Sequence, residues 1–225
     1  QSILDRAHAL AQMSDRPSNA KGVAITPLNR TISDDVLKYE HVEVSIDRTK
    51  RAATFTIHSP KTNTVQSIEE IEAQSSNWYP FAMARELEDA ILNMRTNELD
   101  VGIWIIKTQG SHEAVSAMDN TLMAHKDHWF VRETIGLLRR TLSRFDVSSR
   151  SLFALIEEGS CFNGTFLELA LTCDRIYQLI LPDNETNTPK IMVTDVNFGV
   201  YPMATGQSRI ARRFYGEEPA ISAIR

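Results

Sequence analysis

The stretch EEGSCFNGTFLELALTCDR, residues 157–175, decides our interpretation of the sequence. It opens with two acids and a glycine, passes through small residues, and then becomes an apolar run typical of a buried helix, with the carboxylate of Glu168 inside it. Burying a charge costs free energy unless the charge is paired or serves a site. Glu168 therefore belongs either to a site that needs a carboxylate at the start of a helix or to a solvated edge of that helix.

The local pattern around Glu168 predicts a strand, a glycine-containing loop and a helix, in that order. SLFALIEEG, residues 151–159, is typical of a buried strand, and the helix is expected from about Gly164 to Cys173. The first amides of a helix have no internal partners and favour negative charge, so they could stabilise the oxyanion of a thioester carbonyl. Glu168, one turn in, is placed to act as a general acid or base. Spacing alone favours the plainer alternative, a first-turn glutamate stabilised by the helix dipole.

Composition excludes several classes of protein. The chain has 225 residues, enough for one or two domains, and its apolar and charged fractions of 42% and 24% are ordinary for a globular protein. A formal net charge of -5 gives no basic footprint for nucleic acid. No apolar stretch approaches the ~20 residues of a membrane span. Cys161 and Cys173 form neither a disulfide framework nor a zinc motif, which fits the cytoplasm.

Along the rest of the chain, strands alternate with helices, which predicts an α/β fold with parallel pairing and right-handed crossovers. A β-hairpin is expected over residues 41–59, because apolar residues alternate on both sides of RTK. Residues 61–80 are polar and are expected to be irregular. We expect helices at 1–14, 81–97, 131–145 and from 207 onward, and further strands at 101–108, 174–181 and 191–199.

Two further segments carry candidate site residues. TDVNFGVYPMATGQSR, residues 194–209, places Asp195 before glycines and a proline that would hold a carboxylate near a site, or else it is a connecting loop. KTQGSHEAVSAMD, residues 107–119, could supply a second oxyanion amide, or is merely a helix start. Cys161 could be a nucleophile, but no histidine near it in sequence would activate it, so a packed thiol is favoured.

Three blocks of the sequence, in the right order, resemble the crotonase (enoyl-CoA hydratase/isomerase) superfamily. ATFTIHSPKTNTV resembles its opening strand and N-R-P-x-x-N-A-L, and LLRRTLSRFDVSSRSLFALIEEGSCFNGTFLELALTCDRIY resembles its central block ending in E-L-A-x-x-C-D. NFGVYPMATGQSRIARRFYG resembles the following block, G-x-x-P-x-x-G-x-x-R-L and a basic helix. The resemblance covers about residues 41–216 and implies a crotonase-like ββα spiral that lacks the C-terminal helices.

The resemblance assigns roles residue by residue. Glu168 and Asp195 fall on the two catalytic carboxylates of the superfamily, and the oxyanion amides fall on Gly164 or Thr165 and on about Val115. The usual G-G-G is here Gly164, Thr165 and Phe166, so a Cβ stands where a thioester needs close approach. An acyl-CoA substrate is implied, with no metal and no cofactor, since CoA is part of the substrate.

More narrowly, DHWFVRETIGLLRRTLSRFDVSSRSLFALIEEGSCF and NFGVYPMATGQSR resemble the second half of a ring-opening acyl-CoA lyase of this superfamily. That lyase acts on a dihydrodiol thioester of an aromatic acid and gives an aldehyde-bearing acyl-CoA and formate. Residues 1–37 are then expected to link to a missing N-terminal crotonase-like half, on which residues 38–225 pack, within a homo-oligomer. Two alternatives stay open: a hydratase or isomerase acting on another acyl-CoA, and a non-catalytic support domain of the lyase.

Overall fold

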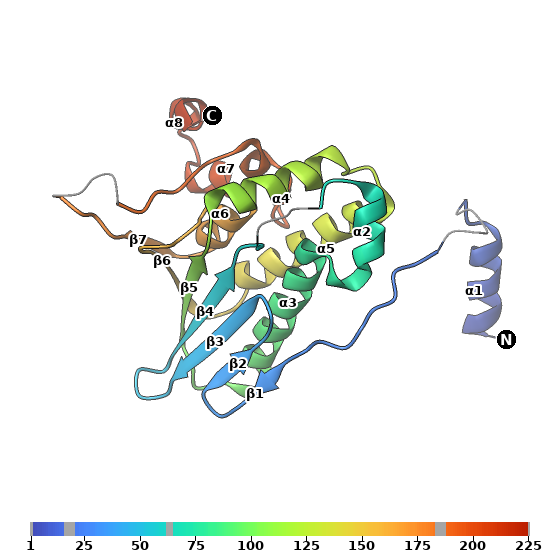
Figure 1. Cartoon of the computed structure of the whole chain (residues 1–225), viewed down its shortest axis with the longest axis horizontal. Helices are drawn as coiled ribbons and strands as arrows, with labels where there is room; N and C mark the ends of the chain where they lie inside the picture. Colours follow the sequence, from blue (N-terminus) through green and yellow to red (C-terminus); the bar gives the residue numbers. More distant parts are fainter. Residues whose placement is uncertain (1, 16–20, 62–64, 183–187, 225) are drawn as a thin grey trace.

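The computed structural model describes residues 2–15, 21–61, 65–182 and 188–224. Within these ranges the strands form one mixed sheet in which every strand lies next to its neighbours in the sequence (Figure 1). The strands are β1 (Thr31–Ile32), β2 (Val36–Lys38), β3 (Val42–Asp47), β4 (Ala52–His58), β5 (Ile103–Gln109), β6 (Ser151–Ile156) and β7 (Arg175–Gln178). The predicted α/β class is confirmed.

The sheet has an antiparallel half and a parallel half. β1 to β4 pair antiparallel, and the predicted hairpin is the β3–β4 pair, in which Val44 lies opposite Phe55. β4 to β7 pair in parallel, because each connection between them contains a helix that carries the chain back to the start of the next strand. Alternating residues such as Val42, Val44 and Ile46 are buried on one face of the sheet.

Amphipathic helices cover that apolar face. α3 and α5 lie side by side against the sheet, and α4, α6 and α7 gather at the ends of β5 and β6 (Figure 1). The helices are α1 (Ile3–Gln12), α2 (Ile68–Gln74), α3 (Tyr79–Asn97), α4 (His112–Ala124), α5 (Trp129–Asp146), α6 (Gly164–Leu171), α7 (Arg209–Arg213) and α8 (Glu218–Ile224). Figure 1 shows α1 apart from the rest, and none of its described residues is buried.

The parallel strands bring two distant loops together at one end of the sheet. The loop after β5 and the loop after β6 lie next to each other, because their strands pair in register. The Gly110 amide donates to the Gly159 carbonyl at 3.0 Å, and the Cys161 amide donates to the Thr108 hydroxyl at 2.9 Å. Helices α4 and α6, which begin after these loops, are therefore held in contact. This is the place where the sequence predicts a site.

Three sequence predictions differ from the structure. Residues 61–80, expected to be irregular, contain α2, whose N-terminus is stabilised by a capping box between Ser67 and Glu70. Residues 191–199 do not form the expected strand: Met192 makes a single bridge with Asn163, and the 3-10 helix η3 (Asp195–Phe198) follows. The range 1–37, expected to be a connector, includes β1 and part of β2, so the sheet begins inside it.

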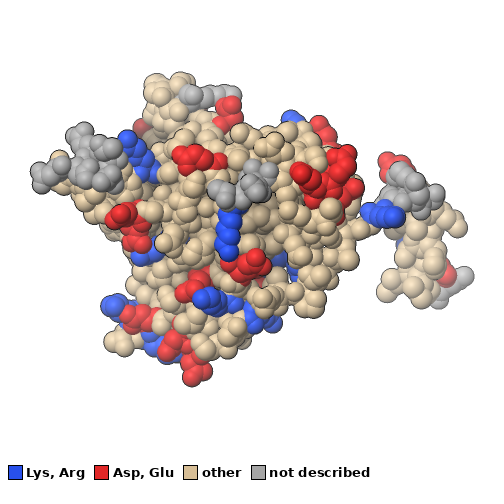
Figure 2. Space-filling model, in the orientation of Figure 1, with Lys and Arg blue, Asp and Glu red and all other residues tan. Residues whose placement is uncertain are grey.

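The surface shows the charge balance expected from the sequence. On the face drawn in Figure 2, acidic and basic side chains are mixed around the turns below β3 and β4, while a group of acidic side chains lies near α2. Arg48 there pairs with Asp35 and Glu98, and Lys50 pairs with Asp47. Of the helices that the structure describes, none is long and apolar enough to cross a bilayer.

Candidate active site

Helix α6 begins where the sequence predicts it, at Gly164. The Asn163 residue before it has extended backbone, and Gly164 itself has a φ of +45°, which glycine adopts more readily than other residues. Glu168 lies one turn further along and is only 1% exposed. The alternative of a solvated edge is therefore wrong, and the carboxylate must find its partners inside the protein.

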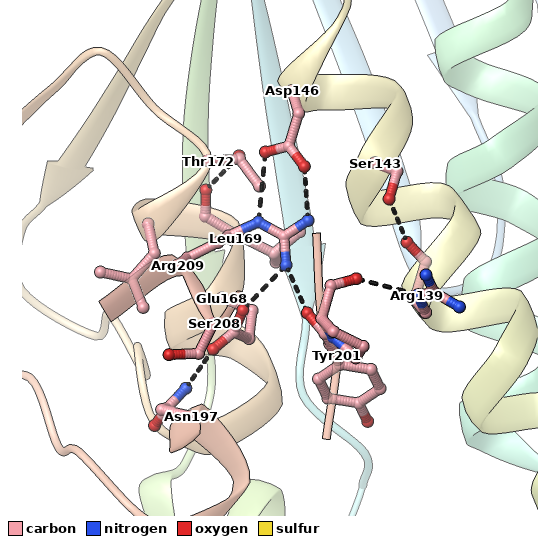
Figure 3. Close-up of polar contacts among 12 residues, drawn as sticks. Arg139, Ser143, Asp146, Glu168, Leu169, Thr172, Asn197, Tyr201, Ser208 and Arg209 are labelled. Carbon is pink, nitrogen blue, oxygen red and sulfur yellow. Dashed lines mark hydrogen bonds and ion pairs between the residues drawn. The ribbon is translucent and has the colours of Figure 1, made fainter. Parts of the chain in front are cut away.

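Both oxygens of the Glu168 carboxylate are bonded to other parts of the chain (Figure 3). Oε1 accepts from Asn197 Nδ2 at 2.8 Å, and Oε2 accepts from Arg209 Nη1 at 3.0 Å. Burial raises the pKa of Glu168, while the hydrogen bond from Asn197 and the guanidinium of Arg209 act in the opposite direction. The carboxylate is thus anchored to η3 and to α7.

Arg209 is the centre of this network. Its side chain is 1% exposed, and it donates to the Asp146 carboxylate through Nε at 3.2 Å and Nη2 at 2.7 Å. Its Nη1 also donates to the Tyr201 carbonyl at 3.1 Å. Figure 3 shows Asp146 and Glu168 on opposite sides of one guanidinium, so a buried cation is shared by two carboxylates from α5 and α6.

The predicted oxyanion amides all have protein partners. The Thr165 amide donates to Asp119 Oδ2 at 2.9 Å, and the Gly164 amide donates to the Met192 carbonyl at 3.3 Å. The Val115 amide donates to the Ser111 carbonyl at 3.3 Å within the first turn of α4. The prediction that these amides are open to a thioester carbonyl is therefore not met in this structure, because each is already used to hold loops and helices together.

Asp119, a residue that sequence analysis did not single out, takes the position of an anion at the start of α6. It is 4% exposed, and besides the Thr165 amide it accepts a hydrogen bond from the Thr165 hydroxyl. The Tyr201 hydroxyl bonds the same Thr165 oxygen at 2.9 Å. Burial raises the pKa of Asp119 to about 7, against the lowering effect of the Thr165 bonds.

Gly164 is required by this close approach. A Cβ built on Gly164 would lie 1.9 Å from Asp119 Oδ2 and 3.1 Å from the Thr194 hydroxyl oxygen. The glycine of the predicted oxyanion loop thus makes room for a carboxylate of the protein itself. The quoted motif EAVSAMD ends on Asp119, and that position was the available signal in the sequence.

Asp195 does not join Glu168 as the sequence predicts. It is exposed at the first residue of η3, and Asn197, two residues later, is the η3 side chain that contacts Glu168. The cause is local: the Thr194 amide donates to Asn197 Oδ1 at 3.0 Å, which fixes a tight turn with Asn197 inside. The structure therefore does not bring the two predicted carboxylates together on one cavity.

Cys161, and the histidines His125 and His128, have structural surroundings. Cys161 is buried, and burial raises the pKa of its thiol to about 11, which favours the packed thiol over a nucleophile. His125 bonds the Gln66 carbonyl, and His128 lies near Glu72. Among the described residues, no three His, Cys, Asp or Glu side chains are grouped as metal ligands.

Comparison with known proteins gives two informative matches. Benzoyl-CoA-dihydrodiol lyase of Aromatoleum evansii is 52% identical over 223 residues, which cover 99% of this chain and 40% of that protein. An enoyl-CoA hydratase from Geobacillus kaustophilus HTA426 superposes with a TM-score of 0.51 at 21% identity, over 82% of this chain and 60% of that one. No family model matches.

These matches differ in what they establish. The structural match is below the identity at which function can be compared and shows the fold alone. The sequence match is close, but the chain spans well under half the length of the relative. The chain thus has the crotonase-type fold of an enoyl-CoA hydratase and is, over nearly its whole length, a homologue of one part of benzoyl-CoA-dihydrodiol lyase.

Proposed function

We propose that this chain is a non-catalytic supporting segment of an acyl-CoA lyase that opens the ring of 2,3-dihydro-2,3-dihydroxybenzoyl-CoA. In that reaction the ring is opened and, with one water consumed, one ring carbon leaves as formate, so that an aldehyde-bearing acyl-CoA with one carbon fewer remains. The support for the substrate class is the 52% identity to a benzoyl-CoA-dihydrodiol lyase, and the support for the non-catalytic role is the geometry around α6.

The observation that carries this proposal is that the Thr165 amide is bonded to Asp119. Crotonase-type chemistry on a thioester needs free donors aimed at the carbonyl oxygen. Here the donor at the start of α6 faces a buried carboxylate at 2.9 Å. A thioester oxygen could bind only if Asp119 moved away, which would leave that carboxylate buried without its partners, at a cost of several kcal/mol.

Glu168 supports the same conclusion. A general base needs a lone pair that a substrate proton can reach. Both Glu168 oxygens are engaged, one by Asn197 and one by Arg209, and the side chain is 1% exposed. The carboxylate therefore stabilises the contacts of α6 with η3 and α7 rather than moving protons.

We further infer the setting in which this segment works. The lyase acts in the cytoplasm without a metal or redox cofactor, since CoA enters as part of the substrate. The segment packs on the remainder of the lyase polypeptide, which holds the working oxyanion site, and the lyase is a homo-oligomer. The match to only 40% of the relative supports a larger polypeptide, because the rest of that protein has no counterpart in this chain.

The experiment uses the 225-residue chain, expressed alone and shown to be folded by circular dichroism. It is mixed with the dihydrodiol thioester and, separately, with a simple enoyl-CoA, and product formation and calorimetric binding are measured. We expect no turnover of either compound. Turnover of the dihydrodiol thioester, or hydration of the enoyl-CoA, that disappears in Glu168→Gln but persists in the exposed control Glu158→Gln would overturn the proposal.

A further inference from the structure

A cavity of about 220 Å³ lies between the end of α6, the residue before β7 and helix α7. Its lining consists of three arginines, one acid and two apolar side chains: Leu171, Asp174, Met203, Arg209, Arg212 and Arg213. Asp174, Arg212 and Arg213 are exposed, so the cavity opens to solvent. Arg209, in contrast, is a buried part of the wall, and a buried guanidinium beside two exposed ones makes this cavity a candidate site for an anion.

Arg209 has one N–H group left over for a ligand. A guanidinium carries five N–H donors. The Asp146 carboxylate accepts from two of them, and Glu168 and the Tyr201 carbonyl accept from one each. The fifth N–H group, on Nη2, has no acceptor among the residues that the structure describes. A buried donor without an acceptor costs free energy, so an acceptor that enters the cavity would stabilise the folded chain.

The exposed arginines of α7 also have free donors. Arg212 lies three residues after Arg209, on the same face of the helix, and within the described parts of the chain its guanidinium makes no hydrogen bond and no ion pair. Arg213 Nη2 donates to the Leu171 and Cys173 carbonyls at 3.3 and 2.7 Å, which leaves its Nε and Nη1 free. Capping of the C-terminus of α6 by a cation explains Arg213. It does not explain Arg212, which makes no bond to these carbonyls.

The charges around the cavity favour an anion by a narrow margin. Arg209 adds no net positive charge, because two carboxylates share its guanidinium. The positive charge therefore comes from Arg212 and Arg213, and Asp174 opposes it. The Asp174 carboxylate is held in place, since its Oδ2 accepts from the Leu152 amide at 2.8 Å. Two exposed guanidinium groups against one carboxylate predict weak binding that salt screens.

The geometry of the donors suits a phosphate group. The planar fork of a guanidinium donates two parallel hydrogen bonds to two oxygens of one phosphate, and a tetrahedral anion presents oxygens to donors on several sides. Leu171 and Met203 form the apolar part of the lining and leave room for a short carbon group. A cavity of about 220 Å³ is too small for a whole nucleotide, since sites for drug-sized molecules begin near about 300 Å³.

We propose that this cavity binds a dianionic phosphate group, free or carried by a small monoester, through Arg212, Arg213 and the free N–H group of Arg209. The carbon group of a monoester lies against Leu171 and Met203. The proposal does not rest on the lyase function proposed above, because neither the ligand nor its test involves a thioester. Since the charges are exposed and partly opposed, we expect a Kd of about 5 mM.

The test is an NMR titration of the folded, ¹⁵N-labelled chain with inorganic phosphate, ethyl phosphate and acetate at pH 8. The ionic strength is held at about 0.1 M throughout, because screening changes the affinity. We expect both phosphates to shift the signals of residues 209–213, and acetate, with one charge, to bind at least about fivefold more weakly. Tighter binding of ethyl phosphate would identify a monoester as the occupant, and tighter binding of inorganic phosphate would identify the free ion; both results support the site.

Two substitutions change the charge in opposite directions. Arg212→Gln should raise the Kd of both phosphates about threefold or more, whereas the control Arg6→Gln, on the exposed helix α1, should leave it unchanged. Asp174→Asn removes the opposing charge and should lower the Kd about threefold. If Asp174→Asn fails to fold, the comparison of Arg212→Gln with Arg6→Gln still decides. Absence of shifts near α7 at tenfold above the expected Kd, equal binding of acetate, or an unchanged Kd in Arg212→Gln would each overturn the proposal.

Discussion

Replacing Arg209 by methionine and Glu168 by glutamine separates a structural carboxylate from a catalytic one. In the folded chain, Arg209 neutralises two carboxylates, Glu168 at 3.0 Å and Asp146 at 2.7 Å, and its side chain is 1% exposed. Arg209→Met removes the cation and leaves both acids without it. Glu168→Gln keeps the shape of the side chain and leaves the Asp146–Arg209 pair intact.

The structure sets the size of each effect. Removing one partner of a buried ion pair costs about 3–5 kcal/mol, because an uncompensated charge is left inside. For a chain of this size that lowers the Tm by about 6–20 °C in Arg209→Met. Glu168→Gln loses one charge-assisted bond, which is worth about 1–3 kcal/mol, and the Tm falls by about 2–12 °C. Arg209→Met should therefore be the less stable variant.

The assay pairs thermal unfolding of each variant with ring cleavage by the lyase polypeptide that contains the segment. We expect Glu168→Gln to keep kcat/KM within about twofold per folded molecule while losing stability, and Glu158→Gln to change neither quantity. A carboxylate that acts as a general acid or base contributes about 10²–10⁴-fold to the rate. A loss of that size in Glu168→Gln with an unchanged Tm would refute the structural role.

Three further predictions concern the surroundings of α6. Burial raises the pKa of Asp119 from 3.8 to about 7, so between these pH values the folded chain binds more protons than the unfolded chain. The free energy of unfolding should therefore fall by on the order of 4 kcal/mol as the pH rises from about 4 to 7. In denaturant titrations, Asp119→Asn should lack most of this pH dependence, and an unchanged pH dependence would contradict the assignment. Gly164→Ala should lower the free energy of unfolding by more than about 2 kcal/mol, since φ is +45° and the new Cβ would lie 1.9 Å from the Asp119 carboxylate. The control Gly136→Ala, inside α5 with open space around it, should raise the free energy of unfolding by about 1 kcal/mol in the same denaturant assay. Equal effects of the two substitutions would show that Gly164 is not constrained. Burial raises the pKa of the Cys161 thiol to about 11 and that of the Cys173 thiol to about 12. Both thiols should therefore resist a thiol-specific disulfide reagent at pH 8 until the chain is unfolded in urea. Rapid labelling of the folded chain would show instead that the thiols are accessible.

Local pattern was sufficient to predict most of the fold. The alternation in residues 41–59 predicts the hairpin, and the apolar stripes of α3 and α5 predict helices that pack against a sheet. α2 was not predicted, because its segment is mostly polar and has only one buried residue, Ile71, so there is no apolar stripe. The capping pair of Ser67 and Glu70 was its main signal in the sequence. The expected strand at 191–199 was wrong because an apolar run says nothing of its pairing, and here Met192 finds one bridge only.

The site was harder to predict, because its partners are far apart in the sequence. The burial of Glu168 on α6 follows from the apolar residues around it. Its cation, Arg209, lies 41 residues further on, at the start of a basic run. Asp119 lies 46 residues before Thr165. Sequence spacing cannot show which of several charged residues meet in space. Those contacts decide whether the amides and the carboxylate of α6 are free for a substrate or are already bonded to the protein.

In the proposed supporting role, helix α6 keeps the positions of an active-site framework while its polar groups bond within the chain. A crotonase-type site requires a free amide at the helix start and a carboxylate with a free oxygen in the next turn. In this chain both positions are kept, but Asp119 binds the amide of Thr165, and Arg209 with Asn197 binds the carboxylate of Glu168. The two blocks come from different helices, Asp119 from α4 and Arg209 from α7. Removing either one alone would leave the other in place, so no single substitution returns both a free donor and a free base to this segment.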